Sequence, residues 1–403
     1  QARVQSFQTL QDPTAPVVSP YRRVPQLNAG LLRPAIAGKF DLQIPAEYVR
    51  FTHDTLVEGA RVSLHPRVAM PFQAPGHFVV PRVGLHYANY DLQRVAPGQA
   101  GTATVTVPWT SVDAGLIFER DLRWLGETAT QTLEPRMYYV YAPYRNQNGV
   151  PLFDTALADF NYAQLFSENR FVGGDRFGDA NHVTLALTSR LLNAGGEETL
   201  RATLGQRFYL SAERVGLTPL SPLRESGESD LLAAAVARIA GSWTLGASLQ
   251  YNNQQSQFER YSAAVRYTPE LAKFVSASYR FNRDALSQVD VYGQWPIAPG
   301  WYAVGRYNYS IRDGRLLEGV AGAEYNAGCW LFRAVFQRLQ ASTQTTSSVF
   351  MFQLEFNGFG GVQSGDAADL LKRHVPGYAA TSPGAGNLLP PGQRSRLPVE
   401  QAY

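Results

Sequence analysis

Two short stretches of the sequence place charged side chains at alternate positions. Glu119 and Asp121 flank one residue in IFERD, and Glu134 and Arg136 flank one residue in TLEPR. Since alternate residues of a strand project from the same face, Glu119 and Asp121 could act as a general acid and base. No pocket-forming residues surround them in the sequence, so glycosidase chemistry is not indicated. Glu134 and Arg136 are interpreted either as a charge pair that satisfies itself on a polar face or as part of a ligand-binding surface.

The remaining candidate motifs give little support for catalysis. FVGGDRFGDAN, residues 171–181, is rich in glycine but lacks the G-x-x-x-x-G-K-[ST] pattern and the strand-to-helix context of a phosphate-binding loop. It is better interpreted as an ordered loop in which Asp175 and Arg176 make local contacts. The six histidines show no metal-ligand spacing, and no serine lies in a G-x-S-x-G motif. We therefore predict that the chain is not an enzyme and uses neither a metal nor a cofactor.

The composition indicates a protein rich in strands whose surface meets water only in part. Charged residues make up 17% and aromatic residues 12% of the 403 residues, whereas ordinary soluble domains carry about 25% charged residues. The formal net charge is +3, and no basic run lies beside stacking aromatics, so nucleic-acid binding is not indicated. The sequence contains no run of about 18 apolar residues, so a transmembrane helix is not predicted.

Alternation of apolar and polar residues recurs along the whole chain. In residues 132–141, TLEPRMYYVY, one face would carry Glu134 and Arg136 and the other only apolar or aromatic side chains. About 18 such segments occur, each near the roughly ten residues that a tilted membrane strand needs. Short turns such as IAPG and NAG alternate with longer polar loops, among them 92–110 and 142–181. An open sheet would leave unpaired edges in lipid, so we predict an all-β, antiparallel transmembrane barrel of the outer membrane, with the aromatic face toward lipid.

The C-terminal part of the chain divides into a last strand and a tail. The last strand, 347–356, places four apolar side chains on one face, and these are Phe350, Phe352, Leu354 and Phe356. We expect a barrel domain over residues 1–356 and a periplasmic tail over 357–403. The tail would hold a short helix within 364–378 and would be disordered over 379–403, where Pro, Gly and Ser are frequent.

Several stretches resemble the LptD family of lipopolysaccharide (LPS) assembly proteins. In the order found in the family, they include ARVSLHPRVAMP (60–71), TQTLEPRMYYVYAPYRNQ (130–147), LFDTALADFNYAQLFSENRFVGGDRFGDANHVTLALTSR (152–190) and DLLKRHVPGY (369–378). The resemblance spans residues 20–378 and is most specific over 130–190. It implies that LPS is placed in the outer leaflet by a barrel of about 26 strands. With about 18 strands, this chain is expected to lack the family's N-terminal jelly-roll domain and its first strands.

The resemblance also implies partners and a route. An LptE-like lipoprotein would plug the lumen, LPS would arrive along a periplasmic bridge through the jelly roll, and barrel-assembly machinery would insert the protein. LPS would leave sideways between the first and last strands, and residues 347–356 would be the last strand of this gate. Cys329 would form a disulfide with a cysteine in the missing N-terminal region. The alternative for Cys329 is a free luminal thiol.

Side-chain parity and the resemblance together give candidate contacts with LPS or with the plug. They are Glu119, Asp121, Glu134, Arg136, Asp175, Arg176, Arg190 and Arg207. A polar wall that only solvates the lumen remains the alternative for these residues, and loop 171–181 either folds inward onto the plug or has a purely structural role. Two other functions remain open. One is a general diffusion porin of about 16–18 strands, and the other is an outer-membrane enzyme, for which no catalytic dyad or triad is found.

Overall fold

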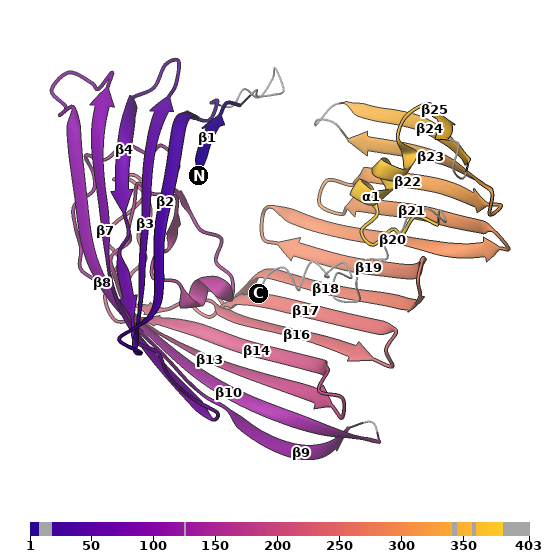
Figure 1. The fold of residues 1–403 in the computed structure, drawn as a ribbon, viewed down its shortest axis with the longest axis horizontal. Helices are drawn as coiled ribbons and strands as arrows, with labels where there is room; N and C mark the ends of the chain where they lie inside the picture. The colour runs from indigo at the N-terminus through magenta and orange to yellow at the C-terminus, as the bar shows by residue number, and fades with distance from the viewer. Residues whose placement is uncertain (8–17, 125, 341–344, 357–359, 382–403) are drawn as a thin grey trace. The chain divides into compact units, whose positions relative to one another are not determined.

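The computed structural model describes residues 1–7, 18–124, 126–340, 345–356 and 360–381. In this part of the chain, 23 strands form one hydrogen-bonded sheet and two short strands form another. The predicted antiparallel all-β fold is confirmed. The strands are labelled in Figure 1, and the chain divides into two compact units. The first comprises Gln1–Arg120, Thr132–Thr188 and Leu204–Asp230, and the second comprises Asp121–Gln131, Ser189–Thr203 and Leu231–Tyr403.

The first unit is built on long N-terminal strands joined as antiparallel neighbours. β2 pairs with β3, β3 with β4 and β5, these with β7, β7 with β8, and β8 with β10. The bounds are β1 Ala2–Gln5, β2 Arg22–Ile36, β3 Phe40–Thr52, β4 Glu58–Leu64, β5 Arg67–Ala69, β6 Phe72–Ala74, β7 His77–Gln93, β8 Thr102–Leu116 and β15 Gly227–Glu228. Strands β9 Phe118–Trp124, β10 Glu127–Ala142, β13 Ala180–Asn193 and β14 Glu198–Tyr209 contribute residues to both units.

The second unit is an antiparallel meander in which each strand pairs with the next along the chain. Its strands are β16 Leu231–Ile239, β17 Trp243–Asn252, β18 Gln257–Glu270, β19 Lys273–Asn282, β20 Leu286–Ala298, β21 Trp301–Ser310, β22 Arg315–Asn326, β23 Trp330–Gln340, β24 Thr346–Phe356 and β25 Gly360–Gln363. One helix, α1 Ala367–His374, follows the last strand. No described helix is long and apolar enough to span a membrane.

Several strands, β10 among them, expose an apolar face and bury the other. Within residues 132–141 of β10 the exposed side chains are Leu133, Met137 and Tyr141, whereas Tyr138 and Val140 on the opposite face are fully buried. This confirms the two faces predicted for residues 132–141. A contiguous exposed apolar surface of this kind is unfavourable in water and is the lipid-facing pattern of a membrane strand.

Short turns link the strands at the predicted positions. At Gly300, between β20 and β21, the backbone φ is +76°, and an added Cβ would lie 2.8 Å from the backbone oxygen of Asn326. Only glycine accepts this conformation without strain. The turn therefore depends on the glycine of IAPG.

The prediction of a loop over residues 92–110 is wrong for its C-terminal half. β7 extends to Gln93 and β8 begins at Thr102, so the connection comprises only residues 94–101. The stretch TATVTV looks polar, but threonine and valine are both β-branched and fit a strand.

The sheet has more strands than the predicted number because five of them contain four residues or fewer, and the other eighteen contain seven or more.

The C-terminal tail contains a helix within the predicted segment 364–378. Helix α1 begins after Asp366, whose Oδ1 accepts a hydrogen bond from the backbone N–H of Asp369 at 2.8 Å. It ends before Pro376, which lacks the backbone donor that a helix needs. Disorder is expected over residues 379–403. Of these, residues 382–403 lie outside the described part of the chain.

Candidate functional site

The long connection between β10 and β13, residues 143–179, packs on the buried face of the first unit. Its Phe153 and Phe177 join a hydrophobic cluster with Phe51, Tyr90 and Val107 of β3, β7 and β8. Phe153 stacks on Phe51 with ring centroids 4.5 Å apart. The connection is therefore an ordered part of the molecule, and we call it the covering loop. It contains the short elements β11 Ala156–Leu157, η1 Ala163–Phe166 and β12 Phe171–Val172.

A buried arginine holds the covering loop to the strands. Arg61 of β4 is 1% exposed. Its Nη1 donates to Asp154 Oδ1 and to Asp175 Oδ1 at 2.7 Å each, and its Nη2 donates to Glu47 Oε2 at 2.7 Å and Asp154 Oδ2 at 2.8 Å. The planar guanidinium of arginine carries several N–H donors and can therefore bind several carboxylate oxygens at once. Gly174 lies against the guanidinium, since a Cβ there would come within 2.6 Å of Arg61 Cζ.

The two loop carboxylates that share Arg61 differ in their electrostatics. Asp175 also accepts hydrogen bonds from the backbone N–H groups of Phe153 and Asp154 and from the Tyr90 hydroxyl. Burial nevertheless raises the pKa of Asp175 and outweighs the opposing charge of Arg61. Burial acts in the same direction on Asp154, but the two hydrogen bonds and the charge of Arg61 prevail and lower the pKa of that carboxyl. Asp154 is therefore the main counter-ion of the guanidinium.

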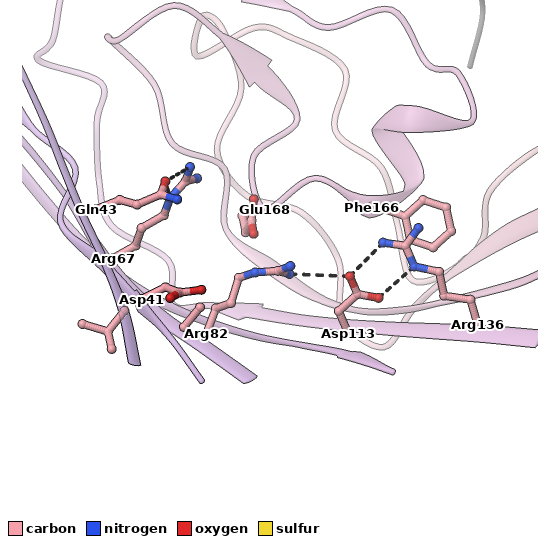
Figure 2. A pocket seen from close by; sticks show the side chains of 10 residues that line it. Asp41, Gln43, Arg67, Arg82, Asp113, Arg136, Phe166 and Glu168 are labelled. Atoms are coloured by element: carbon pink, nitrogen blue, oxygen red, sulfur yellow. Dashed lines mark hydrogen bonds and ion pairs between the residues drawn. The ribbon is translucent and has the colours of Figure 1, made fainter. Parts of the chain in front are cut away.

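A polar pocket of about 300 Å³ lies between the covering loop and the strands. Figure 2 shows Arg82 and Arg136 reaching toward Asp113. Arg136 donates through Nε and Nη2 to the two Asp113 oxygens at 2.8 and 2.7 Å, and Arg82 Nη1 lies 3.7 Å from Asp113 Oδ2. The Arg136 guanidinium also lies over the Phe166 ring, 3.8 Å from its centroid. The remaining lining residues are Asp41, Gln43, Arg67, Val68, Ala69 and Glu168.

The pocket offers many hydrogen-bonding groups. It combines the arginines Arg67, Arg82 and Arg136 with Asp41, Asp113 and Glu168, so its formal charges balance. A second pocket of about 260 Å³ shares Arg67 and Glu168 with it. Planar donors, carboxylate acceptors and an aromatic ring suit hydroxyl and phosphate groups. Among the described residues, no group of three or more His, Cys, Asp or Glu is placed to hold a metal ion.

The structure brings together some of the sequence-predicted residues. Arg136 lines the pocket and pairs with Asp113 instead of satisfying Glu134 on its own strand. Glu134 accepts a hydrogen bond from the Thr132 hydroxyl at 2.8 Å. Arg176 lies beside Asp175 in the covering loop and donates to its backbone oxygen at 3.1 Å.

Other predicted residues lie elsewhere. Arg207 of β14 is buried and donates to the backbone oxygen of Gln164 in the covering loop at 2.5 Å. Glu119 and Asp121 lie on the exposed strand β9, and Asp121 Oδ1 accepts a hydrogen bond from the Thr130 hydroxyl. Arg190 of β13 lies in the second unit, where its Nε is 3.9 Å from Glu198 Oε2.

The predicted disulfide and gate residues lie near the C-terminus. Cys329 is exposed, at the turn between β22 and β23, and is a free thiol in the described part of the chain. In β24, Phe350, Phe352 and Phe356 are exposed by 64%, 41% and 46%. Leu354 shares their face and is half-buried.

Sequence reasoning missed the residues that build the covering-loop anchor and most of the pocket. They are Glu47, Arg61, Arg67, Arg82, Asp113 and Asp154. Arg61, Arg67 and Asp154 do occur in the stretches that resemble the family, ARVSLHPRVAMP and LFDTALADF. No periodicity within those stretches indicates that Arg61 meets Asp154, which lies 93 residues further along the chain.

Comparison with known proteins agrees with the family resemblance of these motifs. Residues 1–301 match the family model LptD, described as LPS transport system D. The LPS-assembly protein LptD of Aromatoleum aromaticum is 43% identical over 380 residues, which cover 94% of this chain and 47% of that protein. The protein of the same name from Thiobacillus denitrificans is 43% identical over 379 residues, covering 93% of this chain and 51% of that protein. This chain spans about half the length of these relatives.

A ferric enterobactin receptor of Pseudomonas aeruginosa is similar in structure at 10% identity and a TM-score of 0.36, covering 84% of this chain and 62% of that one. An identity and a TM-score this low establish neither a shared fold nor a shared function. The family match and the antiparallel strands with one apolar face identify the fold as that of an outer-membrane β-barrel. With a family match over three quarters of its residues and 43% identity to relatives, the chain belongs to the LptD family.

Proposed function

We propose that this chain forms part of an outer-membrane barrel that places LPS in the outer leaflet through a lateral opening between strands. The observation that carries the proposal is the LptD family match over residues 1–301. The two-faced strands support it, because they separate an exposed apolar face from a buried face that carries the polar pocket. LPS has the same division, since its acyl chains are apolar and its glycan is polar and phosphorylated.

The pocket beneath the covering loop is proposed as part of the glycan route. Arg67 and Arg82 can donate charge-assisted hydrogen bonds to phosphate groups, and Asp41 and Glu168 can accept from sugar hydroxyls. Arg136 and Asp113 hold each other in place and shape one wall. The predicted contact residues Asp175, Arg176 and Arg207 would act indirectly, because they fix the covering loop.

The proposed partners follow from the family. They are LPS, an LptE-like lipoprotein plug, a periplasmic LPS bridge that joins through a jelly-roll domain outside this chain, and the barrel-assembly machinery. The tail after β25 is proposed to lie on the periplasmic side, and Cys329 to pair with a cysteine outside this chain. The chain itself is proposed to perform no covalent chemistry, so the energy for transport would be supplied by its partners.

Photocrosslinking in cells tests the proposed route. A photoreactive residue replaces Gln43, which lines the pocket, in the full-length parent protein, and a matched residue replaces Glu270 at the exposed turn between β18 and β19. We expect a crosslink to LPS from position 43 that disappears when LPS synthesis is blocked, and little crosslink from position 270. Equal labelling from both positions, or none from position 43, would contradict the route.

A further inference from the structure

The C-terminal segment, residues 360–381, returns across the buried face of the second unit. Helix α1 contacts β23 and β24 (Figure 1). Leu371 and Val375 are 1% and 0% exposed. The segment shares one hydrophobic cluster with five sheet residues, and these are Phe274, Tyr292, Val304, Val320 and Val335. We call this segment the C-terminal clamp.

Buried polar contacts fix the end of the clamp. Tyr378 donates from its hydroxyl to Glu324 Oε2 at 2.5 Å, and Arg333 Nε donates to the same oxygen at 2.5 Å. Glu324 and Arg333 are 0% and 1% exposed. Gln294 exchanges two hydrogen bonds with the backbone of Ala379, at 2.9 and 3.0 Å. Departure of the clamp would remove the Tyr378 hydroxyl from the Glu324 carboxylate, and a hydrogen bond to a charged group contributes more than one between neutral groups.

The beginning of the clamp holds the last long strand, β24. Ser364 accepts a hydrogen bond from the backbone N–H of Phe352 at 3.0 Å and donates from its own backbone to the Phe352 oxygen at 3.1 Å. The backbone N–H of Ala368 donates to Gln353 Oε1 at 3.1 Å. Strand β25 pairs with residues 353–356 of β24. The C-terminal half of β24 is therefore held both along its edge and on its buried face.

The other half of the β24 edge has no strand beside it in the described part of the chain. β24 pairs along its whole length with β23, but on its other side the described strand pairs reach only residues 353–356. Phe350 on this half is 64% exposed. Unpaired backbone groups are not tolerated in lipid, so the open edge needs a partner strand. The relatives are about twice as long as this chain, and the partner that fits is a strand of the same polypeptide from outside residues 1–403.

We propose that the C-terminal clamp makes β24 the fixed side of the lateral opening, so that β24 keeps its place when LPS passes. This rests on the proposed function for the passage of LPS, but not for the clamp itself. Parting the open edge breaks a short ladder of backbone hydrogen bonds. Releasing β24 would in addition expose the clamp cluster and disturb the Glu324–Arg333 pair.

A disulfide across the clamp tests whether it stays closed. A Cβ added at Gly365 would lie 3.4 Å from Met351 Cγ, which is within reach of a disulfide. The full-length protein carries Met351→Cys with Gly365→Cys, and each single variant is a control. Under oxidising conditions, we expect LPS delivery to the cell surface by the double variant to stay within about twofold of delivery by each single variant. Loss of delivery in the double variant alone would show that the clamp must open and would overturn the proposal.

Hydrogen exchange tests the clamp without reference to LPS. Leu371→Ala removes a buried clamp side chain, and Lys372→Ala changes its exposed neighbour. In the purified full-length protein, Leu371→Ala should speed exchange of the β24 amides by about tenfold or more, as expected for loss of core packing, while Lys372→Ala should leave it unchanged. Unchanged exchange in both variants would refute the clamp. If the two variants exchange as expected but the parent protein delivers no LPS, only the proposed function would be refuted.

Discussion

Replacement of Arg61 by methionine should release the covering loop. Methionine keeps an unbranched side chain of similar length but removes all four hydrogen bonds to Glu47, Asp154 and Asp175. Removing one partner of a buried ion pair costs about 3–5 kcal/mol. The lower end applies here because Asp175 keeps its backbone and Tyr90 donors. A loss of about 3 kcal/mol raises the population of the open loop about 100-fold.

Hydrogen exchange of the covering loop measures this opening directly. The backbone N–H groups of Phe153, Asp154 and Gly174 are bonded to the loop carboxylates and exchange only when the loop opens. We expect their exchange to quicken about 100-fold in Arg61→Met. Arg33→Met, on the exposed part of β2, is the matched control. Equal exchange in Arg61→Met and the parent protein would refute the anchoring role of Arg61.

Three further predictions concern pH, strand facing and a turn. The lowered pKa of Asp154 means that its carboxylate stabilises the closed loop above the ordinary pKa of 3.8, and that this stabilisation is lost as pH falls through the lower folded pKa. Loop exchange, corrected for the intrinsic rate, should therefore rise in strong acid, and this rise should be absent in Asp154→Asn. Leu187→Arg on the exposed face should cost about 2–4 kcal/mol near the bilayer midplane, and more than Thr188→Arg on the other face, as judged by urea unfolding in detergent or lipid. Gly300→Ala should lower the unfolding midpoint in the same assay, with a cost of about 1–2 kcal/mol for the left-handed backbone.

The faces of the strands could be predicted because they depend only on neighbouring residues. Parity alone separates Leu133 and Met137 from Tyr138, and the structure places them on opposite faces as expected. The boundaries were less predictable where polar residues also favour strands, as in the TATVTV stretch of β8. There, pairing with β7 decides the conformation.

The site itself could not be predicted because its contacts join distant parts of the chain. Arg136 pairs with Asp113 across two strands, 23 residues apart, and not with Glu134 beside it. Arg61 meets Asp175 across 114 residues. Such contacts depend on strand register and on how the covering loop packs, and neither leaves a period in the sequence. The family resemblance indicated the right stretches but not which of their side chains meet.

The most direct test of the central claim is surface LPS in cells that depend on this protein. The full-length parent replaces the host's own LPS-assembly protein in a Gram-negative strain in which that protein can be depleted, and antibody binding to intact cells measures LPS in the outer leaflet. We predict that the parent restores surface LPS and growth. Normal insertion of the parent protein into the outer membrane, with ion conductance but no surface LPS, would contradict the account and favour a porin.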